Sequence, residues 1–338
     1  MKKIITSISR NTASQPTEYE FQKLAIQRKL LTSQNELNQF KRIEAGALGE
    51  IQFAQIMNNF GLPQWSYLQN VWLKDYAMLE CDYILVTNHC VYIFEIKNYF
   101  GVFEYQNGQC KSRGVDISYN PLNQIHNATV HLNNLLQNYS YNIPVKGVLV
   151  FVGEHNKVLI HDDIDHIDII TSNEVYAYIQ GIIHEERMSQ VSINTEYLLT
   201  YLEKFEVVNP YAITPYDSSD ITEQHTGLFC KMCAKKLIVT RNIYIECSCG
   251  FQEYREHLIV RTACDYGVLT HGTNFVVRDI WHFAGSSPSH DYLKKVLLKH
   301  FNIVPNERIL TLENYGQPLY NLTNHFSFEK PNRMIITP

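Results

Sequence analysis

The spacing of apolar residues near the N-terminus predicts two helices. Leu and Phe residues recur at roughly helical intervals from about residue 18 to 40, and Thr17 with Glu20 fits a capping box at the start of that stretch. A second helix is expected over about 43–59, closed by Gly61. A short strand is expected to follow over residues 67–74.

The clearest strand signal is a pair of apolar runs, residues 81–87 and 90–98, that are rich in Tyr, Ile, Val and Phe. Asn88 and His89 separate the runs and predict a two-residue hairpin turn. With that turn, the numbers of paired residues sum to 177. A one-residue error in the register would move every side chain to the other face of the sheet.

The segments after the hairpin alternate between strand and helix patterns. Asn120 and Pro121 fit the N-cap and first position of a helix that runs to about residue 138. Up to residue 170 the order is therefore helix, strands, helix, strand, which indicates an α/β layered domain. The expected strands are residues 102–105, followed by an Asn107-Gly108 turn, residues 145–152 and residues 167–170.

Three charged residues lie on the otherwise apolar hairpin. The predicted register places Asp82 opposite Glu95, and Lys97 shares the face of Glu95 because side chains alternate along a strand. Two opposed carboxylates repel each other unless a cation lies between them. Mg²⁺ is typically bound by one or two carboxylates together with phosphate oxygens, and an adjacent lysine can contact the phosphate that is attacked. The trio therefore suggests metal-assisted hydrolysis of phosphodiesters, while a solvated strand face with a cross-strand ion pair is the structural alternative.

A third acid is expected to approach this trio from the second helix. Gly46, Gly49 and Glu50 lie on neighbouring parts of one helical face. Each glycine costs a helix about 1 kcal/mol relative to alanine, which suggests a packing or functional reason for both. We expect the glycines to let the helix approach the sheet closely and to bring Glu50 towards Asp82 and Glu95.

The order of these motifs, GALGE, CDYILV, VYIFEIKNYFG and then NPLNQ on a helix, resembles the NERD (nuclease-related) domain over residues 42–155. The resemblance implies a restriction-endonuclease-like α/β fold, with a central mixed β-sheet flanked by helices, and a PD-(D/E)xK site. It implies that Asp82 and Glu95 bind Mg²⁺ or Mn²⁺ with support from Glu50, that Lys97 is catalytic, and that Gln124 orients substrate or water. Cys81 stands where the family pattern has a proline, and the chemistry does not use that residue.

Four of the eight cysteines form a C-x2-C-x13-C-x-C pattern, which is typical of a structural zinc site. Four thiolates leave no open coordination position, so this zinc is expected to stabilise a small ribbon rather than to catalyse. Buried free thiols are the alternative. The pattern consists of Cys230, Cys233, Cys247 and Cys249.

Two short helices are expected near the C-terminus, over residues 276–283 and 290–301, separated by a Gly-containing turn. The second helix has an apolar stripe and three lysines, Lys294, Lys295 and Lys299, that point elsewhere. This pattern fits a helix-turn-helix, or more plainly a helical cap with a solvated lysine face.

Composition limits the classes of function. The chain has 338 residues, 45% of them hydrophobic and 19% charged, which is a globular balance, and its net charge of −5 excludes a uniformly basic surface. The excess of basic residues is local, over residues 1–43, 227–261 and 271–305. With no apolar run of membrane-spanning length and no signal-peptide pattern, we expect a cytoplasmic protein without a membrane partner.

The sequence therefore predicts a metal-dependent nuclease with a structural zinc ribbon. DNA is the expected substrate; RNA, strand preference and oligomeric state are left open, with a homodimer as one option for an enzyme that cuts both strands. The rivals are a non-catalytic nucleic-acid- or protein-binding module and a structural zinc protein of a larger complex. The expected organisation is an N-terminal helical extension (1–41), the nuclease-like domain (42–206), a linker (207–226), the zinc ribbon (227–265) and a C-terminal helical segment (266–338).

Overall fold

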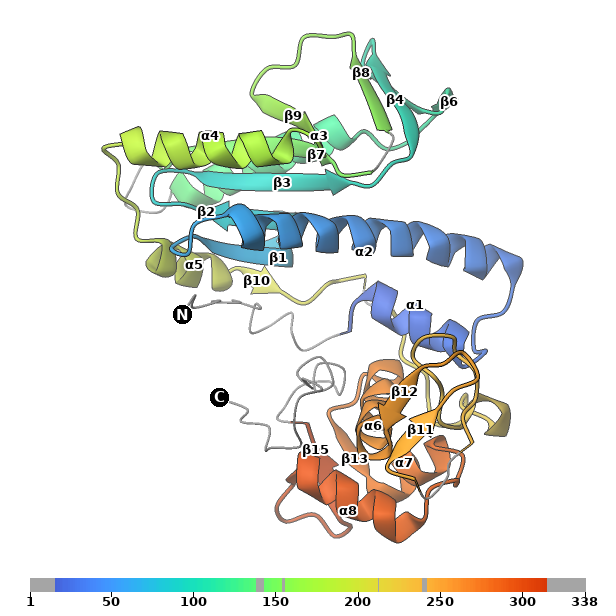
Figure 1. The fold of residues 1–338 in the computed structure, drawn as a ribbon. Helices are drawn as coiled ribbons and strands as arrows, with labels where there is room; N and C mark the ends of the chain where they lie inside the picture. Colours follow the sequence, from blue (N-terminus) through green and yellow to red (C-terminus); the bar gives the residue numbers. More distant parts are fainter. Residues whose placement is uncertain (1–15, 138–142, 154–155, 212, 239–241, 315–338) are drawn as a thin grey trace. The chain divides into compact units, whose positions relative to one another are not determined.

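The computed structural model describes residues 16–137, 143–153, 156–211, 213–238 and 242–314 (Figure 1). The chain divides into two compact units, each with its own hydrophobic core. Among the described residues, unit 1 comprises 42–211, and unit 2 comprises 16–41 together with 213–314.

Unit 1 is built on a six-stranded mixed sheet with the strand order β10-β1-β2-β3-β7-β9. The strands β10, β1, β2 and β3 pair antiparallel, whereas β3, β7 and β9 pair parallel. The predicted α/β fold with a central mixed sheet is therefore confirmed. The bounds are β1 Ser66–Lys74, β2 Met78–Val86, β3 Val91–Lys97, β7 Val145–Phe151, β9 Ile167–Thr171 and β10 Glu206–Val207.

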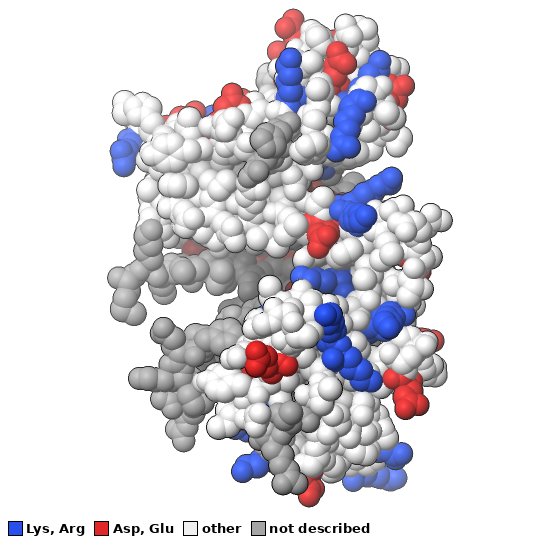
Figure 2. All heavy atoms as spheres, turned by 45° about the vertical axis from the view of Figure 1, so that its right-hand side comes forward, with Lys and Arg blue, Asp and Glu red and all other residues white. Residues whose placement is uncertain are grey.

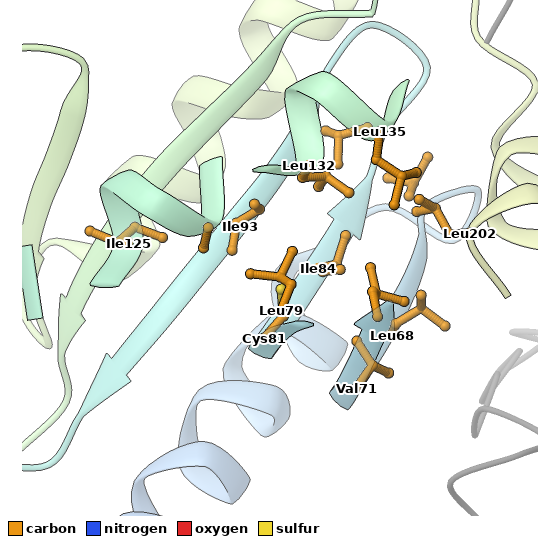
Figure 3. Packing of buried hydrophobic residues seen from close by; sticks show 14 of the residues in the cluster. Leu68, Val71, Leu79, Cys81, Ile84, Ile93, Ile125, Leu132, Leu135 and Leu202 are labelled. Atoms are coloured by element: carbon orange, nitrogen blue, oxygen red, sulfur yellow. The ribbon is translucent and has the colours of Figure 1, made fainter. Parts of the chain in front are cut away.

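Helices cover both faces of this sheet. On one face, α3 and α5 pack against the sheet through leucines such as Leu132 and Leu202 (Figure 3). On the other face, Phe53 of α2 and Ile179 of α4 pack against Tyr83 and Phe94. Both faces of the central strands are apolar because both are buried, as expected for the parallel part of a sheet. The bounds are α2 Gln34–Phe60, α3 Pro121–Gln137, α4 Val175–Met188 and α5 Thr195–Glu203.

The β2–β3 hairpin has the predicted register. Tyr83 pairs with Phe94 and Val86 with Val91, so the numbers of paired residues sum to 177. The turn is closed by the Thr87 N–H, which donates to the Cys90 carbonyl at 3.0 Å. The two-residue turn therefore fixes which side chains of β2 and β3 face each other.

A second, four-stranded sheet of unit 1 has the order β6-β5-β4-β8. The sequence predicted only β4 and the turn after it, where Asn107 and Gly108 have positive φ values of 52° and 75°. The other strands are short, and even the apolar end of β8, residues 158–160, is too brief to give a strand signal. Basic and acidic side chains lie side by side over this sheet at the top of Figure 2. The bounds are β4 Gly101–Gln106, β5 Gln109–Ser112, β6 Val115–Asp116 and β8 Asn156–Ile160.

The N-terminal helices divide differently from the prediction. The helix α1 (Glu18–Gln27) starts at the predicted Thr17 capping box but ends well before residue 40, because Lys29 adopts a left-handed φ of 61°. The next helix, α2, starts after Ser33, whose hydroxyl and backbone N–H exchange hydrogen bonds with Glu36. This second capping box went unnoticed in the sequence, and it replaces the predicted start near residue 43.

Unit 2 combines α1 with the cysteine-containing segment and the C-terminal helices. Its centre is α6, which is buried along most of its length and therefore has no one-sided apolar period that would predict a helix. This helix runs across residue 265, where the sequence suggested a boundary. The bounds are β11 Tyr244–Glu246, β12 Gln252–Tyr254, α6 Arg255–Thr270, β13 Asn274–Val276, α7 Val277–Phe283, α8 His290–His300, β14 Asn302–Ile303 and β15 Thr311–Glu313.

Buried charges hold α1 to α6 within unit 2. The fully buried Arg28 donates to the carbonyls of His225 and Gly227 and forms an ion pair with Asp265 at 3.4 Å. Arg261 adds an ion pair with Glu253 at 2.8 Å, so two arginines are balanced by two acids. Removing one partner of such a network typically costs 3–5 kcal/mol, since a buried charge is left without compensation.

None of the helices in the described part of the chain has both the length and the apolar character needed to cross a membrane.

Candidate functional site

The candidate site lies where the β2–β3 ladder ends. The last backbone pair is Tyr83 with Phe94, and the next position is occupied by Asp82 and Glu95. Here an Oδ atom of Asp82 accepts the Ile96 N–H at 2.7 Å in place of a backbone carbonyl. Because its side chain completes the hydrogen bonding of β3, the Asp82 carboxylate is held at the edge shared by the two strands.

On the neighbouring strand β1, Asn70 lies opposite Asp82 of β2. The β1–β2 pairing is interrupted between Gln69↔Tyr83 and Val71↔Cys81, and Asn70 has a left-handed φ of 50°. Its side chain hydrogen-bonds to Glu50 of α2. Asparagine tolerates this backbone conformation better than most residues. The irregular strand position therefore connects Glu50 to the site.

The helix α2 approaches the sheet closely at Gly49, as predicted. A Cβ at this position would lie 2.7 Å from Cβ of Asn98 and 3.0 Å from Val152. Asn98 also donates to the Ala45 carbonyl at 2.7 Å, which ties the end of β3 to α2. Gly46 has open space around it, so the prediction was wrong for that residue.

Lys97 forms an ion pair with the buried Glu95 on the same strand. Burial lowers the pKa of Lys97, but the charges of Glu95 and Asp82 outweigh it and raise this pKa above its ordinary value. The ammonium group also lies 4.7 Å from the centre of the Tyr119 ring. Lys97 is therefore a permanently charged, oriented cation at the end of β3.

The carboxyl groups around Lys97 hold their protons more tightly than isolated acids do. Burial, followed by the charge of Asp82, raises the pKa of Glu95 to about 8 and that of Glu50 to about 7. Burial also raises the pKa of Asp82, although Lys97 and the Ile96 N–H oppose this shift. Burial is the largest cause of each shift, so these acids lie in a poorly solvated site.

Four acids, Glu50, Glu80, Asp82 and Glu95, thus surround Lys97, and we call these five residues the charged cluster. Glu80 was missed in the sequence, although it lies two positions from Asp82 and so belongs to the same face. Local desolvation and the charge of Asp82 raise its pKa. Asn70 and Tyr119 were missed too, and an asparagine inside an apolar strand was the only signal for Asn70.

Gln124 lies in the first turn of α3, after the predicted N-cap Asn120, whose side chain accepts the Leu122 N–H at 2.9 Å. Within the described residues, the Gln124 side chain makes no hydrogen bond to the charged cluster. Its Oε1 is buried and finds no partner there. A buried amide oxygen without a partner costs about 1–3 kcal/mol and is a group that a ligand could satisfy.

The charged cluster fits a divalent cation through its chemistry. Hard cations prefer carboxylate oxygens, and a positive charge beside Glu50, Asp82 and Glu95 would favour their charged forms, which burial disfavours. The three acids do not form a closed set of ligands, because the cysteine cluster is the only group of three or more metal-ligating side chains close enough to hold an ion among the described residues. Mg²⁺ needs only one or two carboxylates when phosphate oxygens complete its shell.

The four predicted cysteine ligands of unit 2 converge on one point. Their sulfur atoms all lie within 4.8 Å of one another, with Cys230–Cys249 at 3.7 Å and Cys233–Cys247 at 3.4 Å. Four sulfurs bound tetrahedrally to zinc at about 2.3 Å would lie roughly 3.8 Å apart. The cluster therefore fits the small zinc module that the spacing predicts.

Both cysteine pairs lie on similar turns. The Ala234 N–H donates to the Cys230 carbonyl at 2.9 Å, and the Gly250 N–H donates to the Cys247 carbonyl at 2.8 Å. In each turn the residue after the second cysteine is left-handed, with φ values of 58° and 86°. Backbone N–H groups also point at the sulfurs, and the Cys249 N–H is the main reason that the pKa of Cys247 falls to about 6. The pKa values of Cys230 and Cys233 rise instead, because burial disfavours the thiolates and the four thiols share their protons. Donors aimed at sulfur favour the thiolate form that binds metal.

Comparison with known proteins places the charged cluster in a recognised family segment. No curated protein and no solved structure matches the chain. The family model described as the nuclease-related domain, NERD, matches residues 45–152. This segment begins within α2, shortly before Gly49, and ends just after β7. Residues 45–152 of this chain therefore match the family model of the nuclease-related domain, and the chain also contains a four-cysteine cluster that fits a zinc ribbon.

Proposed function

We propose that the nuclease-related domain hydrolyses phosphodiester bonds of DNA at the charged cluster, with Mg²⁺ or Mn²⁺ as cofactor. The observation that supports this most strongly is the surplus of carboxylates around one oriented lysine, with Glu50 and Glu95 holding protons up to about pH 7 and 8. Buried structural ion pairs are usually balanced in charge, whereas here one base is shared by the desolvated Glu50, Asp82 and Glu95 and by the exposed Glu80. Such an imbalance is typical of sites that bind a cation or a polarised substrate.

In this proposal, Asp82 and Glu95 hold the divalent ion and Glu50 supports it. When bound, such an ion would offset the negative charge of the phosphate and lower the pKa of a water molecule that it binds. Lys97 donates hydrogen bonds to phosphate oxygens as negative charge develops on them. Glu95 and the Tyr119 ring hold the Lys97 ammonium group in place. The Gln124 amide, whose oxygen is buried without a described partner, positions the strand or the attacking water.

The proposal is tested with the zinc-loaded full-length protein on supercoiled, linear and single-stranded DNA. We expect cutting that requires added Mg²⁺ or Mn²⁺. Asp82→Asn retains an oxygen that can accept the Ile96 N–H, so it removes charge without opening the strand. Both Asp82→Asn and Lys97→Met should cut at least about 100-fold more slowly, the usual effect of removing one charge-stabilising group.

Matched controls are Asp116→Asn and Lys157→Met, which make the same changes at exposed positions of the second sheet. They should cut within a factor of two of the wild type. Wild-type cutting rates in Asp82→Asn or Lys97→Met would contradict the proposal. Salt-sensitive DNA binding without any cutting would instead support the non-catalytic binding module. Light scattering with and without DNA tests the homodimer.

A further inference from the structure

The last part of unit 2 combines helices and strands in a fixed order. Along the chain it runs α6, β13, α7, α8, β14 and β15, and its three strands form an antiparallel sheet with the order β13-β15-β14. The helices α6, α7 and α8 share one core, which the sheet joins through Phe275 and Leu312. Three helices followed by a β-hairpin form a helix-turn-helix with a wing.

We propose that residues 255–314 are a winged helix-turn-helix that binds double-stranded DNA, with α8 in the major groove and the loop between β14 and β15 on the sugar–phosphate backbone. This binding goes beyond the hydrolysis proposed above. It does not depend on that hydrolysis, since cationic side chains need no divalent ion to contact phosphates.

The turn between α7 and α8 is held firmly, although it is longer than in most such motifs. The Ser286 N–H donates to the Trp281 carbonyl at 3.0 Å, and the Trp281 indole N–H donates to the Pro288 carbonyl at 2.9 Å. Gly285 has a φ of 73°, which glycine adopts without strain. The turn therefore fixes the direction of α8 relative to α7, as groove recognition requires.

The helix α8 buries one side and presents cations on another. Leu293, Val296 and Leu297 are buried in the core of unit 2. Lys294 and Lys295 are exposed, and neither forms an ion pair within the described residues. The two lysines therefore remain available for phosphates.

The end of α8 is already engaged. Lys299 and His300 contact Glu256 of α6 at 2.7 Å and 2.6 Å, so these two residues fix α8 to its neighbour. The first two turns of α8, which include Lys294 and Lys295, therefore remain as the surface that can contact DNA. Asp291 is the acid on this surface, and it will limit the affinity.

The wing supplies a third cation. The loop between β14 and β15 is closed by the Val304 N–H, which donates to the Thr311 carbonyl at 3.0 Å. Asn306 turns the chain with a φ of 66°, and Arg308 is exposed, with Glu307 as its acidic neighbour. An arginine on a hairpin tip that directly follows α8 is suited to the backbone beside the groove.

The width of a helix such as α8 favours duplex DNA over duplex RNA as the ligand. A helix with its side chains is about 10–12 Å wide and fits the B-DNA major groove of about 12 Å. The major groove of A-form RNA is deep and too narrow for side chains to read. The proposal therefore commits to double-stranded DNA.

The test measures fluorescence anisotropy of a labelled 20-bp DNA duplex with the full-length Asp82→Asn protein, loaded with zinc and without Mg²⁺. In this background, Lys294→Glu with Lys295→Glu should weaken binding at least about tenfold at 100 mM salt and reduce the slope of log K against log salt by about 2. Arg308→Ala should reduce the slope by about 1.

The matched control is Lys74→Glu with Lys204→Glu, the same charge change at exposed positions of unit 1, and it should weaken binding less than twofold. Thermal unfolding and zinc content establish that each variant is folded. An equal loss in both double variants would overturn the proposal, as would binding of an RNA duplex or single-stranded DNA as tight as that of duplex DNA. Because no cutting is measured, a failed nuclease assay leaves this result intact.

Discussion

The carboxylate of Asp82 has two partners that lower its pKa, and burial opposes them both. The Ile96 N–H and Lys97 favour the charged form, whereas burial favours the neutral form and prevails. Burial, followed by the charge of Asp82, also raises the pKa values of Glu50 and Glu95. The sequence could place Asp82, Glu95 and Lys97 on one face, because a two-residue turn and strand alternation suffice for that. It could not give the pKa values, which depend on burial by other elements.

These shifts predict how stability depends on pH. Since Glu50 and Glu95 have folded-state pKa values of about 7 and 8, above the ordinary value near 4.5, the folded protein binds more protons than the unfolded chain between these limits. The free energy of unfolding of metal-free protein should therefore fall as pH rises from 6 to 9. We expect the fall to exceed about 1.4 kcal/mol, the equivalent of one pKa unit.

Urea unfolding at pH 6, 7.5 and 9 measures this effect. Glu50→Gln with Glu95→Gln should flatten the profile, and Asp116→Asn should leave it unchanged. Mn²⁺ should stabilise the wild type more at pH 8.5 than at pH 6, because protons compete with the ion for the same oxygens. A wild-type profile that rises towards pH 9 would contradict the charge surplus in the cluster.

At the scale of elements, local signals predicted the hairpin, the Thr17 and Asn120 caps and the cysteine turns. Each depends on a few adjacent residues, so the sequence alone was sufficient. The helix α6 and the strands β5, β6 and β8 escaped prediction for different reasons. The helix is buried on most sides and lacks the one-sided period of an amphipathic helix, whereas the three strands are too short to show any period.

The two glycines of α2 provide a matched pair of substitutions. Gly46→Ala fills open space and should stabilise the protein by about 0.5–1 kcal/mol, the usual gain from removing a helix-interior glycine. Gly49→Ala places a methyl group 2.7 Å from Asn98 and should destabilise the protein by about 1–3 kcal/mol, as overpacking does.

Gly49→Ala should also reduce DNA cutting more than Gly46→Ala, since it pushes Glu50 away from the charged cluster. Urea unfolding and the nuclease assay measure the two effects. Similar behaviour of the two variants would show that the close approach of α2 does not matter for the site.

At the scale of the whole molecule, two cores belong to one chain, and α1 is grouped with the C-terminal residues. Phe21 of α1 stacks on Tyr216 at 5.2 Å, and Arg28 pairs with Asp265. No local pattern joins residues separated by nearly 200 positions or more, so only the folded chain shows this grouping. The domain boundaries drawn from the sequence stay predictions.

The zinc module should affect only one of the two units. Chelation of zinc, or Cys249→Ser, should lower the unfolding midpoint of unit 2 and leave that of unit 1 unchanged, because structural zinc contributes directly to folding free energy. The tryptophans separate the signals, since Trp65 and Trp72 lie in unit 1 and Trp281 in unit 2. Comparing the wild type with Trp281→Phe during thermal unfolding isolates each transition. An equal shift of both transitions would contradict this independence.

The sequence by itself determined the features that short-range geometry controls: the register of the hairpin, the face shared by Asp82, Glu95 and Lys97, and the cysteine spacing that fits zinc. A turn of fixed length and the alternation of side chains leave little freedom for these. Tertiary structure decided what depends on distant segments meeting. It brought Glu50 to the cluster through the approach at Gly49, gave the cluster its surplus of charge, and paired β13 with β15 across two helices, because burial and long-range hydrogen bonds exist only once the chain has folded.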